Sequence, residues 1–264
     1  MGTKDNRSVI LTGATGGIGE HMARILAERD YKLILVARNR GKIEKLAKEI
    51  ERGRGIGCDY FVCDLSKEGE IEKLIGAYPE TDVLINNAGF SSYGFFNRSP
   101  WEVERDMLMV NVFAPLRLCH HYIKGMMTRN YGRILNVAST AGMYPAPFFS
   151  SYAGTKAFVI QFSKSLALEL KKYNVSVSTL LPGPTATNFW QVAHMAAKVE
   201  NSFKHFDNPR DVAEFGINLM EKCKICGIAG WKNRGKEILK RFMPEKVWCY
   251  LVRKHMDHPS LYED

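Results

Sequence analysis

Short apolar segments alternate with longer amphipathic segments along most of the chain. Apolar runs of about five to eight residues are typical of strands that a parallel sheet buries on both faces. The longer segments 20–29, 42–52, 100–130 and 152–170 repeat apolar residues at helical spacing. The candidate strands are residues 8–12, 31–38, 56–66, 82–90, 133–139, 175–181 and 225–231. This alternation predicts an α/β fold, a doubly wound parallel β-sheet of about seven strands with helices on both faces.

The chain shows no internal repeat and no linker rich in Gly, Ser or Pro. Its 264 residues therefore predict a single domain, with a core over about 7–230 and a C-terminal helical extension over about 231–264. The extension suits one or two amphipathic helices interrupted at Pro244. Its apolar positions are Ile238, Leu239, Phe242, Val247, Trp248, Leu251 and Val252. We favour packing of this face on the domain or on a partner subunit, with contact to a membrane surface as the alternative.

The formal net charge is +9 and the sequence pI is near 9.2, with much of the excess in the last third of the chain. Such a charge is compatible with three kinds of partner: nucleic acid, a membrane surface or an anionic ligand. No recognisable nucleic-acid-binding module is present, so we expect no nucleic acid partner.

The six cysteines bear on the cellular location. No apolar stretch approaches the length that spans a bilayer, and residues 1–8 contain no apolar signal region. We therefore expect reduced thiols rather than disulfides, and a cytoplasmic location. Cys223 and Cys226 lack a second pair of ligands, so we expect no metal site.

A glycine-rich turn joins the first candidate strand to the first helix, with glycines at Gly13, Gly17 and Gly19. Glycines let backbone approach a pyrophosphate, and the helix that follows supplies free N–H groups and the positive end of its dipole. Glycine turns also join strands to helices for purely structural reasons, so this pattern alone leaves both interpretations open.

The second candidate strand ends at Ala37-Arg38. In dinucleotide-binding folds an acid at this strand end binds the ribose 2′-hydroxyl, whereas a guanidinium suits a 2′-phosphate. Ala37 occupies the acidic position, so the sequence favours NADP over NAD. Arg38 as a solvated loop cation is the structural alternative. At the end of the third strand, Asp64 either accepts from an adenine amino group or caps the following helix.

Ser139, Tyr152 and Lys156 are the candidate catalytic residues. Tyr152 and Lys156 are four residues apart in a helical segment, so the ammonium lies beside the phenol. A nearby positive charge favours the phenolate, and we therefore expect Lys156 to lower the pKa of Tyr152. Ser139 ends a buried strand, where its hydroxyl can hold a substrate oxygen while Tyr152 gives or takes the proton.

Taken together, six motifs from residue 8 to about 190 resemble the short-chain dehydrogenase/reductase family, in its NADP-preferring, hydroxysteroid-dehydrogenase-like branch. They are TGATGGIG at 12–19, NNAG at 86–89, Asn111, Ser139, YAGTK at 152–156 and PGPTAT at 182–187. The resemblance implies a Rossmann-like fold and hydride transfer between a nicotinamide and a carbonyl or secondary alcohol. It also implies that the protein is a homodimer or homotetramer, paired through the helices that contain Asn111 and Tyr152.

The resemblance further assigns roles to single residues. Tyr152 would be the general acid/base, Ser139 would orient the substrate oxygen, and Lys156 would lower the pKa of Tyr152 and bind the nicotinamide ribose. Asn111 would anchor a water in the proton relay. The implied cofactor contacts are Gly13, Thr15, Gly17, Ile18 and Gly19 at the phosphates, Arg38, Asp64 and Leu65 around the adenosine, and Asn87, Ala88, Gly89, Pro182, Gly183 and Thr187 on the nicotinamide side.

Three segments rich in aromatic residues and methionine, 90–99, 143–151 and 188–203, are placed to shape a substrate pocket. Such side chains line sites for bulky apolar ligands, although they equally pack cores and subunit interfaces. A bulky steroid-like or lipid-like ketone or alcohol is the substrate class we expect. A small hydroxy or keto acid is the alternative, and a dinucleotide-binding sensor without turnover is a third hypothesis.

Overall fold

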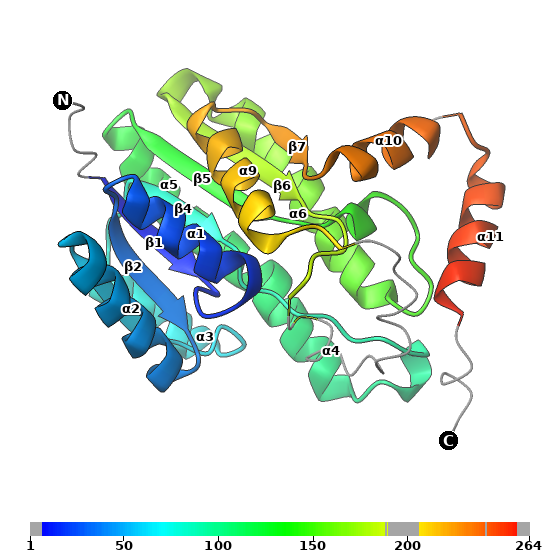
Figure 1. Ribbon diagram of the computed structural model, residues 1–264, viewed down its shortest axis with the longest axis horizontal. Helices are drawn as coiled ribbons and strands as arrows, with labels where there is room; N and C mark the ends of the chain where they lie inside the picture. The colour runs from blue at the N-terminus through cyan, green and yellow to red at the C-terminus, as the bar shows by residue number, and fades with distance from the viewer. Residues whose placement is uncertain (1–6, 188, 190–205, 241, 258–264) are drawn as a thin grey trace.

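The computed structural model describes residues 7–187, 189, 206–240 and 242–257. Seven parallel strands form one sheet in the order β3-β2-β1-β4-β5-β6-β7 (Figure 1). The strands are β1 Ser8–Thr12, β2 Lys32–Ala37, β3 Cys58–Val62, β4 Val83–Asn86, β5 Gly132–Val137, β6 Val175–Leu181 and β7 Cys226–Ile228. The predicted fold class is confirmed. The strand order reverses between β1 and β4, and in open parallel sheets ligands bind beside the carboxyl ends of the strands at such a point.

Helices cover both faces of this sheet, because successive side chains of each strand point to opposite faces. On β1, Val9 and Leu11 pack in a core with α1 Gly17–Glu28, α2 Arg40–Arg54 and α9 Pro209–Glu221. Ile10 packs in the opposite core. That second core is completed by α3 Glu68–Ala77, α5 Ala114–Thr128 and α6 Ser150–Glu169.

The segment predicted as one long helix over 100–130 is interrupted. It divides into α4 Trp101–Leu108, a π-helical turn η2 Met109–Phe113, and α5. Pro115 has no N–H to donate to the Asn111 carbonyl four residues earlier, so regular α-helical bonding fails at this carbonyl. The irregularity expected at Pro115 thus lies just before it, and it contains Asn111.

The C-terminal extension forms α10 Trp231–Lys240 and α11 Glu245–Met256, with Pro244 as the residue preceding α11. Met256 of α11 packs against an apolar cluster of the domain that contains Phe149 and Tyr152. The Trp248 ring meets Tyr144 edge-on, with 5.1 Å between ring centroids. The Tyr93 hydroxyl donates to the Met256 carbonyl at 2.6 Å, and Lys240 Nζ donates to the Met143 carbonyl at 3.2 Å.

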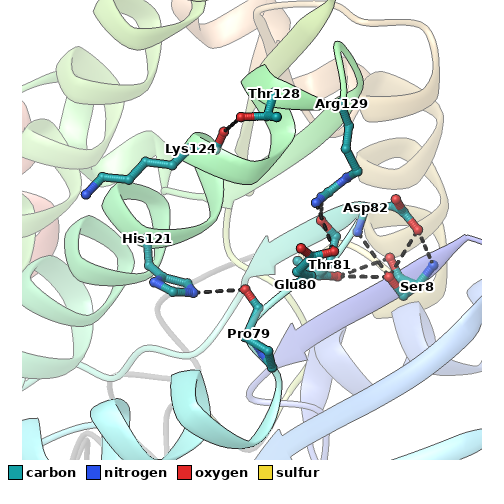
Figure 2. A network of polar contacts seen from close by, with 9 residues as sticks. All are labelled: Ser8, Pro79, Glu80, Thr81, Asp82, His121, Lys124, Thr128 and Arg129. Carbon is teal, nitrogen blue, oxygen red and sulfur yellow. Dashed lines mark hydrogen bonds and ion pairs between the residues drawn. The ribbon is translucent and has the colours of Figure 1, made fainter.

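Polar side chains join β1 and β4 at the amino ends of these strands (Figure 2). The Ser8 backbone N–H donates to Asp82 Oδ2 at 2.9 Å, and the Asp82 N–H donates to Ser8 Oγ at 3.1 Å. Arg129, just beyond α5, donates to the Thr81 carbonyl at 2.8 Å. These bonds fix the starts of β1 and β4 and leave their carboxyl ends to the loops.

Within the described ranges, no helix is both long and apolar enough to span a bilayer. The same residues contain no group of three or more His, Cys, Asp or Glu side chains that could hold a metal ion.

Candidate active site

A cavity of about 810 Å³ lies along the carboxyl edge of the sheet. The loops after β1, β2, β3, β4, β5 and β6 line it, together with residues of α10 and α11. Of the predicted site residues, those lining it are Gly13, Thr15, Gly17, Ile18, Arg38, Leu65, Asn87, Ala88, Gly89, Ser139, Tyr152, Lys156, Pro182, Gly183 and Thr187. Gly19, Asp64 and Asn111 do not line it.

The glycine turn after β1 requires glycine at two positions. Gly13 and Gly17 have φ of +67° and +51°, a region that favours glycine. A Cβ on Gly13 would lie 2.8 Å from the Ala88 Cα, and one on Gly17 would lie 2.9 Å from the Thr187 Cγ2. Gly16 precedes α1 without a side-chain cap, so no side chain of that residue occupies the helix N-terminus. A cradle with free N–H groups at a helix N-terminus fits a pyrophosphate.

Gly19 acts in packing rather than in lining the cavity. A Cβ there would collide with the Gly13 carbonyl oxygen and with the Asn87 side chain. Asn87 closes the turn from the other side, since its Nδ2 donates to the carbonyls of Thr12 at 3.0 Å and Gly13 at 3.1 Å. The Thr12 hydroxyl accepts from the N–H groups of Asn87 at 3.0 Å and Ala88 at 3.1 Å. The turn is therefore tied to the end of β4.

The end of β2 presents cations to the cavity. Arg38 is exposed at its edge, and Lys42, in the first turn of α2, lines it as well. Asn39 caps α2 by accepting from the Lys42 N–H at 2.9 Å. Ala37 is buried and leaves no carboxylate at the position where a ribose 2′-hydroxyl would be held. The pair of cations fits a phosphate at this end of the cavity.

Asp64 makes local hydrogen bonds, and the adenine role implied by the family resemblance stays a prediction. Its carboxylate accepts from the Ser66 N–H at 3.1 Å and from the Ser66 hydroxyl at 2.8 Å. Burial acts to raise the pKa of Asp64, but these bonds outweigh it and the pKa lies below its usual value. The carboxylate holds a turn that leads into α3, which begins at Glu68 rather than Ser66. Of the two interpretations of Asp64, capping is the one that resembles these local bonds more closely.

Ser139, Tyr152 and Lys156 meet at the floor of the cavity. Ser139 lies just beyond β5, and its Oγ accepts from the Ala141 N–H at 3.1 Å and shares a hydrogen bond with Tyr152. Tyr152 and Lys156 lie in the first two turns of α6, with 8% and 4% of their surface exposed. Lys156 Nζ donates to the Val137 carbonyl at 3.0 Å and lies 5.8 Å from the Tyr152 ring centroid.

Burial sets the protonation of both side chains. It raises the pKa of Tyr152 to about 12, although the hydrogen bond with Ser139 acts in the opposite direction. It lowers the pKa of Lys156 to about 8. The net shift of the Tyr152 pKa is thus opposite to the lowering that we expected from Lys156, and Lys156 is not among its causes. At neutral pH the phenol is protonated and the ammonium is charged.

Asn111 is buried behind the cavity wall, with 1% of its surface exposed. Its Oδ1 accepts from the Phe90 N–H at 3.1 Å, and its Nδ2 donates to the Phe90 carbonyl at 2.9 Å and to Thr155 Oγ1 at 3.1 Å. Thr155 in turn donates to the Tyr152 carbonyl at 2.7 Å. The Asn111 side chain thus fixes the loop after β4 and, through Thr155, the first turn of α6.

Gly89 separates Asn111 from Lys156. A Cβ there would lie 3.0 Å from Asn111 Oδ1 and 3.2 Å from Lys156 Nζ. The absence of a side chain is what lets the loop after β4 pass between these two residues.

The sequence interpretation missed the cavity wall supplied by the C-terminal helices. This wall consists of Asn233, Lys236, Glu237, Trp248, Leu251, Val252 and Met256. Asn233 Nδ2 donates to Asp207 Oδ2 at 2.6 Å and to the Ala229 carbonyl at 2.9 Å, and it packs against Gly183. The amphipathic pattern of residues 231–256 signalled a packing face, but nothing in it indicated that the partner surface was a cavity.

All three predicted aromatic segments contribute residues to the cavity lining. The segment 143–151 contributes Tyr144, Ala146 and Phe149, and the segment 90–99 contributes Phe90. Of the third, Phe189 lines the cavity with its ring centroid 5.6 Å from that of Tyr152. The remainder of that segment lies outside the described residues.

Comparison with known proteins gives consistent matches. A very-long-chain 3-oxoacyl-CoA reductase of Laccaria bicolor is 36% identical over 187 residues, which cover 68% of this chain and 55% of that protein. A hydroxysteroid dehydrogenase-like protein 1 of Gallus gallus is 28% identical over 260 residues, covering 94% of this chain and 77% of that protein. The chain spans about three fifths of the length of several curated relatives that it matches.

The fold also matches a solved structure, a short-chain dehydrogenase from Sphingobium yanoikuyae in complex with NADPH. Its TM-score is 0.80 at 24% identity, with 90% of this chain and 97% of that chain covered. A family model described as short chain dehydrogenase matches residues 7–197. The chain therefore belongs to the short-chain dehydrogenase family.

Proposed function

We propose that the protein is an NADP-dependent oxidoreductase that interconverts a bulky apolar ketone and its secondary alcohol, with Tyr152 as the acid/base. The observation that carries this proposal is the cluster of half-buried Ser139 with buried Tyr152 and Lys156, in the lining of a cavity that the glycine turn also lines. A dinucleotide-binding sensor would need the turn, but it has no need for a hydroxyl, a phenol and an ammonium gathered at one point.

The residues of the cleft fit NADP along its length. The uncapped start of α1 and the turn at Gly13 and Gly17 would hold the pyrophosphate, and Arg38 with Lys42 would hold the 2′-phosphate. Lys156 would hold the nicotinamide ribose beside Tyr152. The bound cofactor would supply the hydride donor or acceptor.

Tyr152 and Ser139 then carry the proton chemistry. In reduction the carbonyl oxygen gains negative charge, and two hydroxyl donors meet it in a buried site. A pKa of about 12 keeps Tyr152 protonated across the neutral range. The proton is therefore available for Tyr152 to donate to the carbonyl oxygen as hydride transfer gives that oxygen negative charge. Ser139 holds the same oxygen in position. In the reverse direction Tyr152 must first lose its proton, and its phenolate then takes the proton from the alcohol.

The apolar part of the cavity supports a bulky substrate. Phe149 and Phe189 pack near the Tyr152 ring, and Trp248 and Met256 line the same cavity from α11. Such a wall suits a hydrophobic body more than a small carboxylate. The names of the relatives, a 3-oxoacyl-CoA reductase and a hydroxysteroid dehydrogenase-like protein, support the same class.

The homodimer or homotetramer and the cytoplasmic location stay predictions. Helices α5 and α6 expose Leu116 and Phe158, which are suitable apolar contacts for the expected pairing.

Replacing Tyr152 with Phe removes the proton donor while keeping the ring. We expect turnover of bulky ketones with NADPH to fall by about 10²-fold or more, with NADPH affinity little changed. Turnover is measured as NADPH oxidation in the presence of ketosteroids and 3-ketoacyl esters, and NADPH affinity is measured by fluorescence titration. Tyr144→Phe removes another phenol of the same cavity and should change turnover only slightly. Equal losses in the two variants would contradict a specific role for Tyr152.

Replacing Arg38 and Lys42 together with Ala removes both cations at the end of β2. We expect kcat/KM for NADPH to fall at least about tenfold, because a phosphate loses charge-assisted hydrogen bonds, while kcat/KM for NADH stays nearly constant. Lys45→Ala is a matched control, since Lys45 is an exposed lysine of α2 outside the cavity lining. A wild-type enzyme that prefers NADH would overturn the assignment.

The low pKa of Lys156 predicts a pH profile. The pKa lies at about 8 because burial disfavours the charged form, so the ammonium is present below pH 8 and is lost above it. We expect kcat/KM for NADPH, which reports the free enzyme, to be level below about pH 8 and to fall as pH rises further. Tyr152 stays protonated over this range. A profile that is level well past pH 8 would show that Lys156 keeps its proton.

A further inference from the structure

The outer surface of α10 and α11 carries exposed apolar side chains and cations. On α11, Val247, Tyr250 and Leu251 are 46%, 65% and 44% exposed. Their spacing of three and four residues places them on one side of the helix. Trp231, Leu239 and Phe242, in and just after α10, are 75%, 62% and 84% exposed.

This surface is not the one by which the helices pack. Trp248, Val252 and Met256 of α11 line the cavity, and Trp248 and Met256 also contact Tyr144 and Tyr93. On a helical projection these residues lie opposite Val247 and Tyr250. Helix α11 therefore has two apolar faces, one on the protein and one on solvent.

Cations surround the exposed face. Residues 231–257 contain eight lysines and arginines against three acids. Lys246, Arg253 and Lys254 are exposed on α11, beside Val247 and Tyr250. An apolar stripe with aromatic side chains and flanking cations complements an anionic lipid surface, because the rings lie at the headgroup level while the cations meet lipid phosphates.

The same helix connects this surface to the cavity. Leu251 is 44% exposed and also lines the cavity, so it lies at the cavity mouth. We propose that α10 and α11 dock the protein on an anionic phospholipid surface, with the mouth of the cavity at the lipid boundary. An apolar ligand would then enter from the lipid phase. The docking itself does not depend on the proposed catalytic function.

The test is flotation of the full chain with phosphatidylcholine vesicles that contain or lack phosphatidylserine. We expect binding to the anionic vesicles alone. Tyr250→Asp, and separately Lys246→Glu with Lys254→Glu, should each weaken that binding at least about tenfold. Each variant's circular dichroism and NADPH affinity should match the wild type, since these side chains lie outside the cavity lining.

Two matched controls lie at the opposite end of α6 from the cavity. Leu168 is 66% exposed, close to the exposure of Tyr250, and Lys171 and Lys172 are exposed just after α6. Leu168→Asp, and Lys171→Glu with Lys172→Glu, should leave vesicle binding unchanged. Absence of binding to anionic vesicles, or equal losses in test and control variants, would overturn the proposal. So would a change of oligomeric state in the α11 variants without any vesicle binding, which would assign the face to a second copy of the chain.

Discussion

The parallel pairing of β1 with β4 is the constraint on which the cleft depends. Strands β2 and β3 extend the sheet on one side of this pair, and β5, β6 and β7 extend it on the other. Loops at the two carboxyl ends therefore diverge, and the cavity opens between them. Thr12 and Asn87 bridge the two strand ends by four hydrogen bonds, which hold the glycine turn against Ala88. The geometry of the glycine turn thus follows from sheet topology and from a pair of small polar side chains.

The chemistry of the site comes from a second constraint, the burial of a phenol and an ammonium on one turn of α6. Burial keeps Tyr152 protonated and makes Lys156 a weaker base. Asn111 and Thr155 hold the backbone around these groups, and the π-helical turn before Pro115 presents Asn111. A polar residue at that point of an apolar helix costs stability unless it is bonded, and here every bond it makes orders the site.

The sequence was sufficient for the fold, and most of the site residues that it predicted line the cavity. Strand and helix periods predicted the sheet, and glycines, Ser139 and the Tyr152–Lys156 spacing marked its carboxyl edge. Local patterns could not tell that Asp64 closes a turn with Ser66, because the same carboxylate suits either role. Nor could they give the pKa values, which depend on burial by segments distant in sequence. The cavity wall formed by α11 could not be predicted either, because the pattern of an amphipathic helix does not specify which distant segment its apolar face covers.

The most direct test of the central claim is the fate of the hydride in the reaction of a bulky ketone with NADPH deuterated at C4. Mass spectrometry of the product would locate the label. The account predicts an alcohol with one deuterium on the carbinol carbon, formed by the wild type and nearly absent with Tyr152→Phe. Tight NADPH binding with no labelled alcohol from any ketone of the steroid, acyl or small keto-acid classes would contradict it, and would show that the cleft binds a dinucleotide without using it for reduction.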